Sequence, residues 1–380
     1  MQKTIVVAGH VCLDIIPAFP GLAASLDTLL VPGKLVNVGP AVIATGGAVA
    51  NTGLALHRLG LPIRPVAKVG DDIFGHAVMK LFRAVGAPTD SLIVDPAAAT
   101  SYTVVLNPAG YDRIFLHCPG ANDLFGAADV RPELLADATL FHFGYPPLMK
   151  RMYADGGDEL RSLLVRAKAA GLTTSLDLSL PDPQSPAGRA DWPRILRQAL
   201  PQVDVFVPSL DEVVYMLDRG RSETVRIETA KGVPLGGLSA ADVRQFAERL
   251  TEMGPAIVML KLGAEGVYVR TTSDFGRLAA CGAAAPDVTA WRGAACHAPC
   301  FDVTVAGATG AGDCTIAGFL AALCKGLGPD DAARMAVAAG GASVERPDAT
   351  SGVPSWDALV ARIAAGWKRR KPRTTFPRTV

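Results

Sequence analysis

The sequence predicts an α/β fold with a doubly wound, mostly parallel sheet. Short apolar runs alternate with amphipathic stretches along the 380 residues, which is typical of a parallel sheet covered by helices on both faces. Runs such as Val205–Val207 suit strands that are buried on both faces. Hydrophobic residues make up 49% of the chain, enough for a large core. We therefore expect residues 1–366 to form one domain.

The individual elements follow from residue type and spacing. Strands are expected at 4–8, 65–69, 138–143, 173–178, 203–207, 257–261, 266–269 and 301–306. Apolar residues recur at helical spacing at 48–59, 75–85, 159–170, 192–200, 210–217, 240–252, 314–325 and 330–344. The two sets alternate along most of the chain, and this order predicts β–α units with parallel strands.

Two segments interrupt the alternation, at about residues 15–45 and 98–118. They hold strand-like pieces with no helix between them, at 34–38, 41–44, 101–106 and 113–117. The turn sequence at 107–110 favours a hairpin for the last two pieces. We expect a small β-lid standing on the α/β body; ordinary surface hairpins are the alternative.

Charge and cysteine usage exclude several classes of protein. The formal net charge is +1, so no strong global field attracts nucleic acid or a membrane. The seven cysteines are irregularly spaced, which favours reduced thiols over a disulfide framework and over a zinc site at Cys296–Cys300. The first residues lack the apolar run of a signal peptide, so we expect a cytoplasmic protein. The basic stretch 367–380 is expected to be a solvated tail, with nucleic-acid binding as the weaker alternative.

The segment GATGAGDCTIAGF, which begins at Gly307, is the most informative part of the chain. Its glycines allow a tight turn and a close approach of the main chain to a ligand. The amides of Gly310, Ala311 and Gly312 are expected at the start of a helix, where unpaired donors and the helix dipole favour an anion. Asp313 follows, placed to accept a proton from a group that attacks phosphate. The combination indicates phosphoryl transfer.

Other glycine-rich motifs fit this segment less well. A Walker loop requires G-x-x-x-x-G-K-[ST], and the chain contains no such string. A dinucleotide fingerprint requires a following strand that ends in an acid about 20 residues later, whereas Asp330 and Asp331 open another helix. A purely structural turn explains the glycines but not the acid beside the amides. Asp313 alone is also compatible with a simple helix N-cap.

Four segments resemble the ribokinase-like (PfkB) carbohydrate kinases, in the order that this family has them. They are GGAVAN at 46–51, KVGDDIFG at 68–75, KLGAEG at 261–266, and ATGAGD at 308–313 with AGF after it. The resemblance covers nearly the whole chain. It implies a ribokinase-like fold with a lid and ATP-dependent phosphorylation of a hydroxyl, most simply the hydroxymethyl group of a sugar-like substrate.

The resemblance also implies roles for the acceptor side of the site. Asp313 would be the catalytic base, and the amides of residues 310–312 would hold the charge on the transferred phosphoryl group. Residues expected to bind the sugar are Asp14, Gly46, Gly47 and Asn51. A turn-forming role for Asp14 and a helix-capping role for Asn51 are the plain alternatives.

For the nucleotide side, the resemblance points to Gly263, Gly266 and Thr309. Lys261 departs from the family, in which threonine is common before Leu-Gly, and is a further candidate for the nucleotide side. A lysine at the end of a strand could reach the phosphates of ATP as a point charge, or could simply be solvated. Glu212 occupies the acidic position of an N-x-x-E element and would help to hold hydrated Mg²⁺. Ser209 replaces the asparagine of that element, so Ser209 and Glu212 also fit a plain capping box.

Gly307 stands where the family usually has an aspartate that contributes to a monovalent-cation site, so potassium dependence is doubtful. Three functions remain open from the sequence: a sugar kinase, a nucleoside kinase, and a catalytically idle regulator that binds sugar or nucleotide on the same fold. Between residues 9 and 51 only Phe19 is aromatic and could stack on a base, which favours a sugar over a nucleoside. Unpaired edges of the lid strands are compatible with a homodimer.

Overall fold

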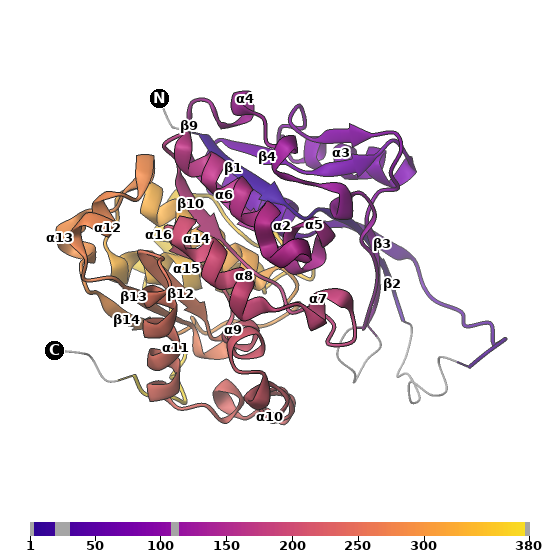
Figure 1. Ribbon diagram of the computed structural model, residues 1–380. Coiled ribbons are helices and arrows are strands. Elements are labelled where there is room, and N and C mark those ends of the chain that lie inside the picture. Colours follow the sequence, from indigo (N-terminus) through magenta and orange to yellow (C-terminus); the bar gives the residue numbers. More distant parts are fainter. Residues whose placement is uncertain (1–3, 20–30, 108–113, 377–380) are drawn as a thin grey trace.

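The computed structural model describes residues 4–19, 31–107 and 114–376 (Figure 1). Its centre is an eight-stranded sheet with the order β14-β13-β12-β11-β10-β9-β1-β4. All neighbours from β12 to β4 pair in parallel, and β13 is antiparallel to both of its neighbours. The strands are β1 (Thr4–Gly9), β4 (Ile63–Val66), β9 (Ala138–Gly144), β10 (Thr173–Leu176), β11 (Val205–Phe206), β12 (Ile257–Lys261), β13 (Val267–Thr271) and β14 (Ala295–Ala298). The expectation of a mostly parallel sheet is confirmed.

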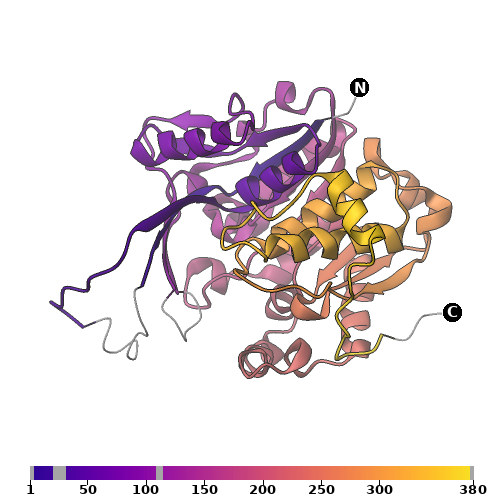
Figure 2. The same ribbon diagram turned by 180° about the vertical axis from the view of Figure 1, so that it is seen from behind.

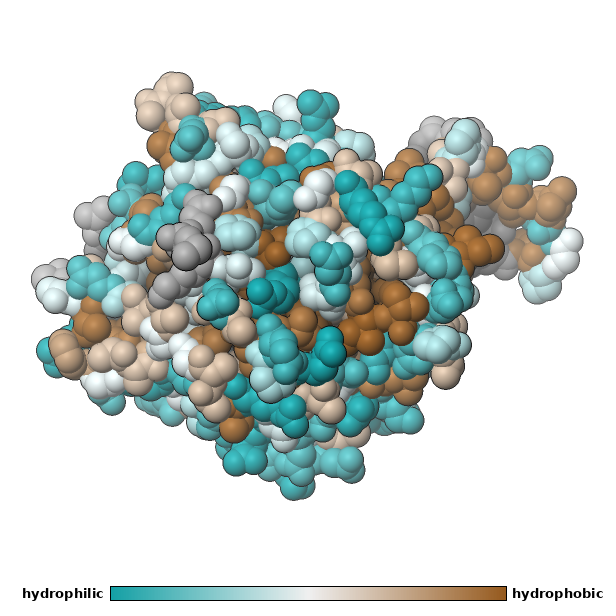
Figure 3. Space-filling view, turned by 90° about the horizontal axis from the view of Figure 1, so that it is seen from above, coloured by the Kyte–Doolittle hydropathy of each residue, from teal (hydrophilic) through white to brown (hydrophobic). Residues whose placement is uncertain are grey.

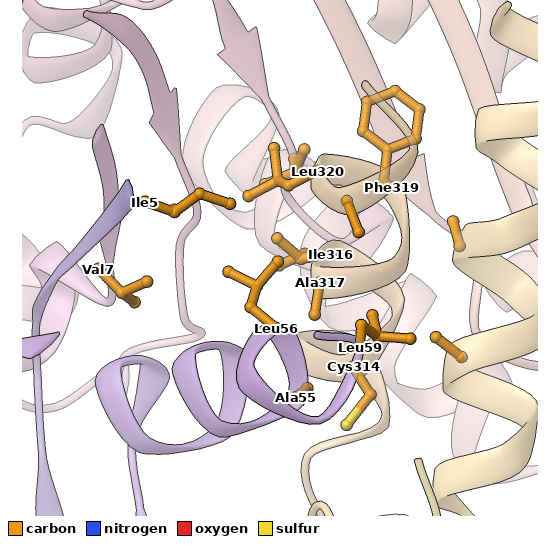
Figure 4. Close-up of a cluster of buried hydrophobic side chains, with 14 of the residues drawn as sticks. Ile5, Val7, Ala55, Leu56, Leu59, Cys314, Ile316, Ala317, Phe319 and Leu320 are labelled. Carbon is orange, nitrogen blue, oxygen red and sulfur yellow. The ribbon is translucent and has the colours of Figure 1, made fainter. Parts of the chain in front are cut away.

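The sheet is buried on both faces because its strands alternate between two apolar cores. In β1, Ile5 and Val7 point into one core, whereas Val6 and Ala8 point into the other, and all four are fully buried. Side chains of successive strand residues lie on opposite faces, so an apolar run with no polar face specifies a central strand. Figure 4 shows Ile5 and Val7 facing Leu56, Ile316 and Leu320 in the first core.

Three helices, α2 (Ala48–Arg58), α14 (Ala311–Cys324) and α15 (Pro329–Ser343), cover the first face. Their small residues let α14 and α15 lie very close together. A Cβ on Gly318 would lie 2.5 Å from the carbonyl oxygen of Met335, and one on Gly340 would lie 2.1 Å from the hydroxyl of Thr315. Such separations are shorter than any normal contact, so these glycines set the spacing of the two helices.

The opposite face carries the second core and the helices α6 (Asp158–Ala169), α8 (Trp192–Ala199), α9 (Leu210–Leu217) and α11 (Ala240–Glu252). The other α-helices of the described residues are α3 (Ile73–Ala84), α4 (Pro132–Leu135), α5 (Lys150–Tyr153), α7 (Pro186–Arg189), α10 (Arg219–Ala230), α12 (Phe275–Ala279), α13 (Val288–Trp291) and α16 (Trp356–Ala364). Helices on both faces make the sheet doubly wound, as expected. The spans expected at 210–217 and 240–252 match α9 and α11 residue for residue.

The lid is a second, four-stranded sheet that projects from the body (Figures 1 and 3). Its order is β3-β2-β7-β8. The strands are β2 (Cys12–Pro17), β3 (Ala41–Gly46), β7 (Tyr102–Leu106) and β8 (Ile114–Cys118). The expected antiparallel hairpin is confirmed as β7–β8, although residues 108–110 of its turn lie outside the described residues. The strand expected at 34–38 is wrong, because this exposed segment pairs with no strand.

Three further expectations differ from the structure. The run expected as one strand at 65–69 divides between β4 and β5 (Lys68–Gly70), and β5 pairs with β6 (Ile93–Asp95). No strand is present at 301–306, because these residues bond to the C-terminal segment and to Val344 instead of the sheet. The stretch 367–376 is not a solvated tail, because Trp367, Arg369, Pro372, Thr374 and Phe376 are half-buried. Residues 377–380 lie outside the described part.

The parallel strands bring their carboxyl ends to one edge of the sheet, below the lid. Ligands of open α/β sheets bind at such an edge. The residues that directly follow β1, β9 and β10 are His10, Tyr145 and Asp177, and Lys261 ends β12. In the described part of the chain, no helix is long and apolar enough to cross a membrane.

Candidate active site

Asp313 lies at the centre of the site, on the first turn of α14. Its side chain is buried and accepts hydrogen bonds from Asn51 Nδ2 (3.0 Å, to Oδ2), Thr52 Oγ1 (3.4 Å, to Oδ1) and the Tyr145 hydroxyl (2.8 and 2.9 Å, to the two oxygens). The N-cap residue of α14 is Gly310, so Asp313 does not cap the helix. The capping alternative for Asn51 is also wrong, because this residue lies inside α2.

The surroundings of Asp313 make it a stronger base than an ordinary aspartate. Burial raises the pKa of the Asp313 carboxyl, while the Lys261 ammonium and the hydrogen bonds from Asn51, Tyr145 and Thr52 lower it. The net shift is upward, since loss of hydration outweighs the favourable partners. A raised pKa favours transfer of a proton to the carboxylate, which is what a general base requires.

A glycine turn leads into the first amides of α14. Gly310 has a φ of 70°, in the left-handed region, and a Cβ there would lie 2.6 Å from Cβ of Ala349. Only glycine fits both the conformation and the space. Because the first amides of a helix have no partner within the helix, those of Ala311 and Gly312 form an anion-binding end; that of Ala311 has only a long bond to the Ala308 carbonyl (3.4 Å).

Tyr145 is a site residue that the sequence analysis missed. It follows β9 with a φ of 67°, which is unusual for a residue with a side chain. Strained backbone of this kind concentrates at functional sites. The conformation directs its partly buried hydroxyl to Asp313. A polar aromatic residue directly after a buried strand is the only signal in the sequence that could have identified it.

Lys261 forms a buried ion pair with Asp177. The distance from Lys261 Nζ to Asp177 Oδ1 is 2.6 Å, and the Lys261 chain runs beside Gly312, with Nζ 3.9 Å from where a Cβ would be. Burial opposes the charge of Lys261, but Asp177, Glu212 and Asp313 outweigh this and raise the pKa of the ammonium above its usual value. The solvated alternative for Lys261 is therefore wrong.

Three carboxyls surround this single ammonium. Burial raises the pKa of both Asp177 and Glu212; Lys261 opposes this shift in each, while nearby carboxyls add to it. Glu212 Oε2 accepts a hydrogen bond from the Ser209 amide (2.7 Å), so the capping box exists as well. Asp177 Oδ2 and the Ser179 hydroxyl are buried without a protein partner. Asp177 was also missed, although an acid directly after a buried strand is a signal for this edge of the sheet.

The cluster fits a hydrated Mg²⁺ better than a metal held by the protein alone. Among the described residues no group of three His, Cys, Asp or Glu side chains forms a metal cage. Mg²⁺ commonly binds through one or two carboxylates, several waters and the phosphates of a substrate. Asp177 with its unpaired oxygen and Glu212 supply that donor set.

A cavity of about 400 Å³ lies between the lid and the start of α14. Its lining comes from His10, Cys12, Asp14, Gly47, Asn51, Thr103, Phe115, His117, Tyr145, Leu148, Leu180, Ala308, Thr309, Gly310 and Asp313. Burial raises the pKa of Asp14 to about 6, although hydrogen bonds from Cys12 (Sγ to Oδ1, 3.3 Å) and Thr103 oppose this. Asp14 lies within β2, so its turn-forming alternative is wrong.

Two histidines face each other in this cavity. Their Nε2 atoms are 3.4 Å apart, and Nδ1 of His117 is 3.0 Å from the Thr103 hydroxyl. Burial lowers the pKa of both rings, and for His10 the neighbouring His117 adds to the effect. Both are therefore neutral at pH 7. Two buried atoms on this lining have no protein partner, His10 Nδ1 and Asn51 Oδ1, and both can bond a ligand.

The structure places the predicted glycines in two different roles. Gly47, with a φ of 87°, lines the cavity. Gly46 does not line it; a Cβ there would lie 2.4 Å from Asp14 Oδ2, so Gly46 makes room for that carboxylate. Gly266 similarly makes room for a neighbouring segment of main chain, since a Cβ there would lie 2.0 Å from the Ala298 carbonyl oxygen. Thr309, expected on the nucleotide side, lines the cavity under the lid instead.

Two further cavities continue from the first. The second, of about 240 Å³, shares Asp313, Gly310 and Tyr145 with it and also includes Asp177 and Glu212. The third measures about 430 Å³ and shares Ser209, Lys261 and Gly312 with the second. The rest of its lining is Leu210, Asp211, Val225, Thr229, Gly232, Val233, Pro234, Leu235, Leu262, Gly263, Ala264, Glu265 and Arg373. Asp313 and the start of α14 thus lie between a cavity under the lid and another beyond Lys261.

The family model for the pfkB family carbohydrate kinases matches residues 2–356, and the chain belongs to this family. Probable fructokinase-3 of Arabidopsis thaliana is 30% identical over 189 residues, which are 49% of this chain and 51% of that protein. The chain thus spans about half the length of the curated relatives it matches. It is similar in fold to the fructokinase of Xylella fastidiosa with bound ATP (TM-score 0.71, 21% identity, covering 96% of this chain and 99% of that one). The ribokinase of Giardia lamblia gives a TM-score of 0.71 at 18% identity, covering 96% and 99% of the two chains.

Proposed function

We propose that this protein transfers the terminal phosphoryl group of ATP to a hydroxyl, most simply a hydroxymethyl group, of an uncharged sugar or sugar-like acceptor. The acceptor occupies the cavity under the lid, and the nucleotide occupies the cavity beyond Lys261. One observation carries the proposal: the buried Asp313 carboxylate and the first amides of α14 lie at the junction between these cavities.

In the proposed reaction, the acceptor hydroxyl attacks the terminal phosphorus and loses its proton to Asp313. The bond between that phosphorus and the bridging oxygen of ADP breaks, and ADP leaves with the electron pair. The amides of residues 310–312 stabilise the negative charge of the transferring group. Lys261 adds a fixed positive charge beside Gly312, held in place by Asp177.

Mg²⁺ would bind near Asp177 and Glu212, through water and the nucleotide phosphates. When bound, such an ion neutralises phosphate charge. The protein favours it electrostatically, because three buried carboxyls share one ammonium.

A monovalent-cation site is not expected at Gly307. A Cβ there would lie 2.8 Å from the Pro347 carbonyl oxygen, so an aspartate does not fit without a shift of the main chain. We expect K⁺ at constant ionic strength to leave turnover unchanged within about twofold, and a marked rise would contradict this.

The lining of the acceptor cavity favours a neutral acceptor. Among its described residues none is lysine or arginine, and both histidines are neutral at pH 7. Asp14 is an acceptor for hydroxyl groups and would repel a sugar acid or sugar phosphate. A nucleoside remains the second candidate, because Phe115, His117 and Tyr145 place aromatic rings around the cavity. All three rings lie outside residues 9–51, the range in which Phe19 is the only aromatic residue that could stack on a base.

We also propose a cytoplasmic protein that binds no nucleic acid and pairs with a second copy through the lid. All seven cysteines are free, which suits a reducing compartment. The strands β3 and β8 form the two edges of the lid sheet, and edge strands offer unpaired main-chain groups. Exposed hydrophobic residues lie on both edges, namely Val42, Ile43, Phe115 and Leu116.

The deciding experiment measures ADP formation from Mg-ATP with a panel of neutral sugars, sugar acids, sugar phosphates and nucleosides. A neutral sugar that raises ADP formation well above the acceptor-free rate supports the proposal, and identification of the phosphorylated product completes it. Activity with nucleosides alone would select the second candidate. Tight binding of ADP and of a sugar without turnover for any acceptor would indicate the idle regulator and contradict the proposed enzyme.

A further inference from the structure

The C-terminal segment carries an observation that the proposed reaction does not use. The family model ends at residue 356, but the chain continues through α16 and then returns along the body. Figure 2 shows this segment in yellow, leaving α16 and running to the end of the molecule where α10 lies. We call residues 367–376 the C-terminal strap. The strap pairs with the stretch after β14 through hydrogen bonds from the Asp302 amide to Lys368 and from the Arg370 amide to Cys300, both 2.8 Å.

The strap is anchored on one buried carboxylate. The side chain of Glu265 is only 3% exposed. Its Oε2 accepts from the amides of Arg373 and Thr374, both at 2.9 Å, and Nε of Arg373 lies 3.3 Å from Oε1. A buried charge without partners is costly, and every hydrogen-bond donor identified for this carboxylate comes from the strap. Phe376 fixes the next turn of chain by stacking on His297, with ring centroids 4.3 Å apart.

Arg373 links the two walls of the third cavity. Glu265 lies on the wall that follows β12, whereas Nη1 of Arg373 donates to the carbonyl of Gly232 (3.1 Å) on the wall that follows α10. Arg373 is also the strap residue that lines the cavity. The phosphate end of this cavity is fixed by Lys261 and Gly312, which it shares with the second cavity. Arg373, with Gly232 and its neighbours, therefore lies on the part of the lining that the second cavity does not share.

We infer that Arg373 binds the nucleoside end of ATP and that the C-terminal strap completes the nucleotide site. The inference rests on the proposed function, since it takes the third cavity as the place of the nucleotide. A guanidinium suits this task because its planar face stacks on an aromatic base and its N–H groups donate to ring or ribose oxygens and nitrogens. Arg373 is about half exposed, so part of the group is free to contact a ligand while the rest holds Glu265.

The test compares Arg373→Ala with Arg370→Ala in the full chain. Arg370 has the same charge, belongs to the same strap, is exposed and does not line the cavity. We expect Arg373→Ala to raise the KM for ATP by about three- to tenfold, which corresponds to about 0.7–1.4 kcal/mol. The KM for the acceptor stays within about twofold, and Arg370→Ala changes neither constant. An unchanged KM for ATP in Arg373→Ala, with activity intact, would overturn the inference.

Two additional measurements keep the inference separate from folding and from the proposed function. If Arg373→Ala melts below the assay temperature, Arg373→Lys retains a charge beside Glu265 but lacks the planar guanidinium, and an unchanged KM for ATP in that variant also overturns the inference. Calorimetric titration with ADP needs no acceptor. Failure of the unaltered protein to bind ADP contradicts the proposed function, whereas equal binding by the unaltered protein and Arg373→Ala contradicts only the role of Arg373.

Discussion

At the scale of single residues, the site depends on how burial changes the behaviour of carboxyls. Asp313 is enclosed by donors from α2 and from the turn after β9, and it keeps a raised pKa despite them. Asp14 is enclosed by the lid and also has a raised pKa. In the proposed reaction Asp313 accepts the proton and Asp14 binds the acceptor, so their titrations are expected to affect different kinetic constants.

The substitution Asp313→Asn removes the proposed base but keeps the size and polarity of the side chain. We expect kcat to fall by about a hundred- to ten-thousand-fold, the range typical of a lost general base. Binding of ADP, measured by calorimetry, changes by less than about twofold. Asp302→Asn is the matched control, since Asp302 is an exposed carboxylate on the same approach to α14. A fall in kcat of less than about tenfold in Asp313→Asn would contradict the assignment.

Asp14 predicts how acceptor binding depends on pH. Its pKa is about 6, above the ordinary value of 3.8, so protonation below about pH 6 removes one hydroxyl-accepting charge. The KM for the acceptor should therefore rise as the pH falls from about 7 to about 5, as steady-state kinetics would measure. In Asp14→Asn the KM is high and no longer varies in this range. A pH dependence confined to kcat would instead implicate Asp313.

The same shift has a consequence for stability. Between pH 3.8 and about 6 the folded chain holds the Asp14 proton while the unfolded chain has released it. The contribution of Asp14 to the free energy of unfolding therefore falls as the pH rises through that interval and stays constant above it. Asp14 lowers the stability of the fold at neutral pH, which is expected of a side chain retained for binding.

At the scale of elements, α14 couples the core to the site. Its first turn carries Asp313, and its other turns pack on α2 and α15. Gly318 faces the Met335 carbonyl so closely that an added methyl group has no room. A shift of α14 to relieve that contact would also move Asp313 relative to Tyr145.

We therefore expect Gly318→Ala to destabilise the fold by about 1–3 kcal/mol, as overpacking does, and to lower kcat. Urea unfolding followed by circular dichroism would measure the first effect. Gly220→Ala is the matched control: Gly220 lies inside α10, with its nearest neighbour 3.9 Å from a Cβ. Alanine there should stabilise by up to about 1 kcal/mol through helix propensity. Equal stability of the two variants would contradict close packing of α14 and α15.

The elements also show what the sequence could predict. Apolar periodicity located α9 and α11 to the residue and the parallel strands to within a few residues, because burial on both faces leaves a continuous apolar signal. The same periodicity wrongly predicted a strand at 301–306. Apolar residues alternate there, but the segment forms main-chain hydrogen bonds with the C-terminal strap instead of with the sheet. That partner lies more than 60 residues further along the chain, so no local pattern reports it.

The site was predictable where a motif specifies main-chain geometry. The glycines before Asp313 predicted a turn and a helix start, and the structure begins α14 directly after Gly310; the roles of Asp313 and of the amides stay predictions that also used the family resemblance. Tyr145 and Asp177 were missed because their roles depend on which strand ends lie side by side, a property of the sheet order rather than of their neighbours in sequence. Lys261 was identified as a charge for phosphate, but its ion pair with Asp177 appears only when β10 and β12 are placed on either side of β11.

At the scale of the whole molecule, the lid sheet projects from the body and carries hydrophobic side chains on its surface. Figure 3 shows hydrophobic side chains on the projecting part. Val42 and Phe115 are 57% and 53% exposed, on β3 and β8 at the two edges of the lid sheet. Extended exposed patches of this kind are typical of protein interfaces. A second copy of the chain is the occupant we propose, since a lid edge offers the same unpaired groups to an identical edge.

This proposal predicts the behaviour of the protein in sedimentation velocity. The unaltered chain should sediment as a dimer at micromolar concentration, and the double variant Val42→Glu, Leu116→Glu should sediment as a monomer, because two charges on the lid edges repel their copies; Leu116 is exposed on β8 and does not line the acceptor cavity. Phe275→Glu is the control, since Phe275 is 58% exposed but lies on α12, away from the lid.

The monomeric variant, whose lid no longer pairs with a second lid, should bind the acceptor more weakly, because Asp14 and His117 lie on lid strands. It should bind ADP as before, because the nucleotide cavity has no lid residue in its described lining. A monomeric unaltered chain would refute lid pairing and leave the assignment of the two cavities intact.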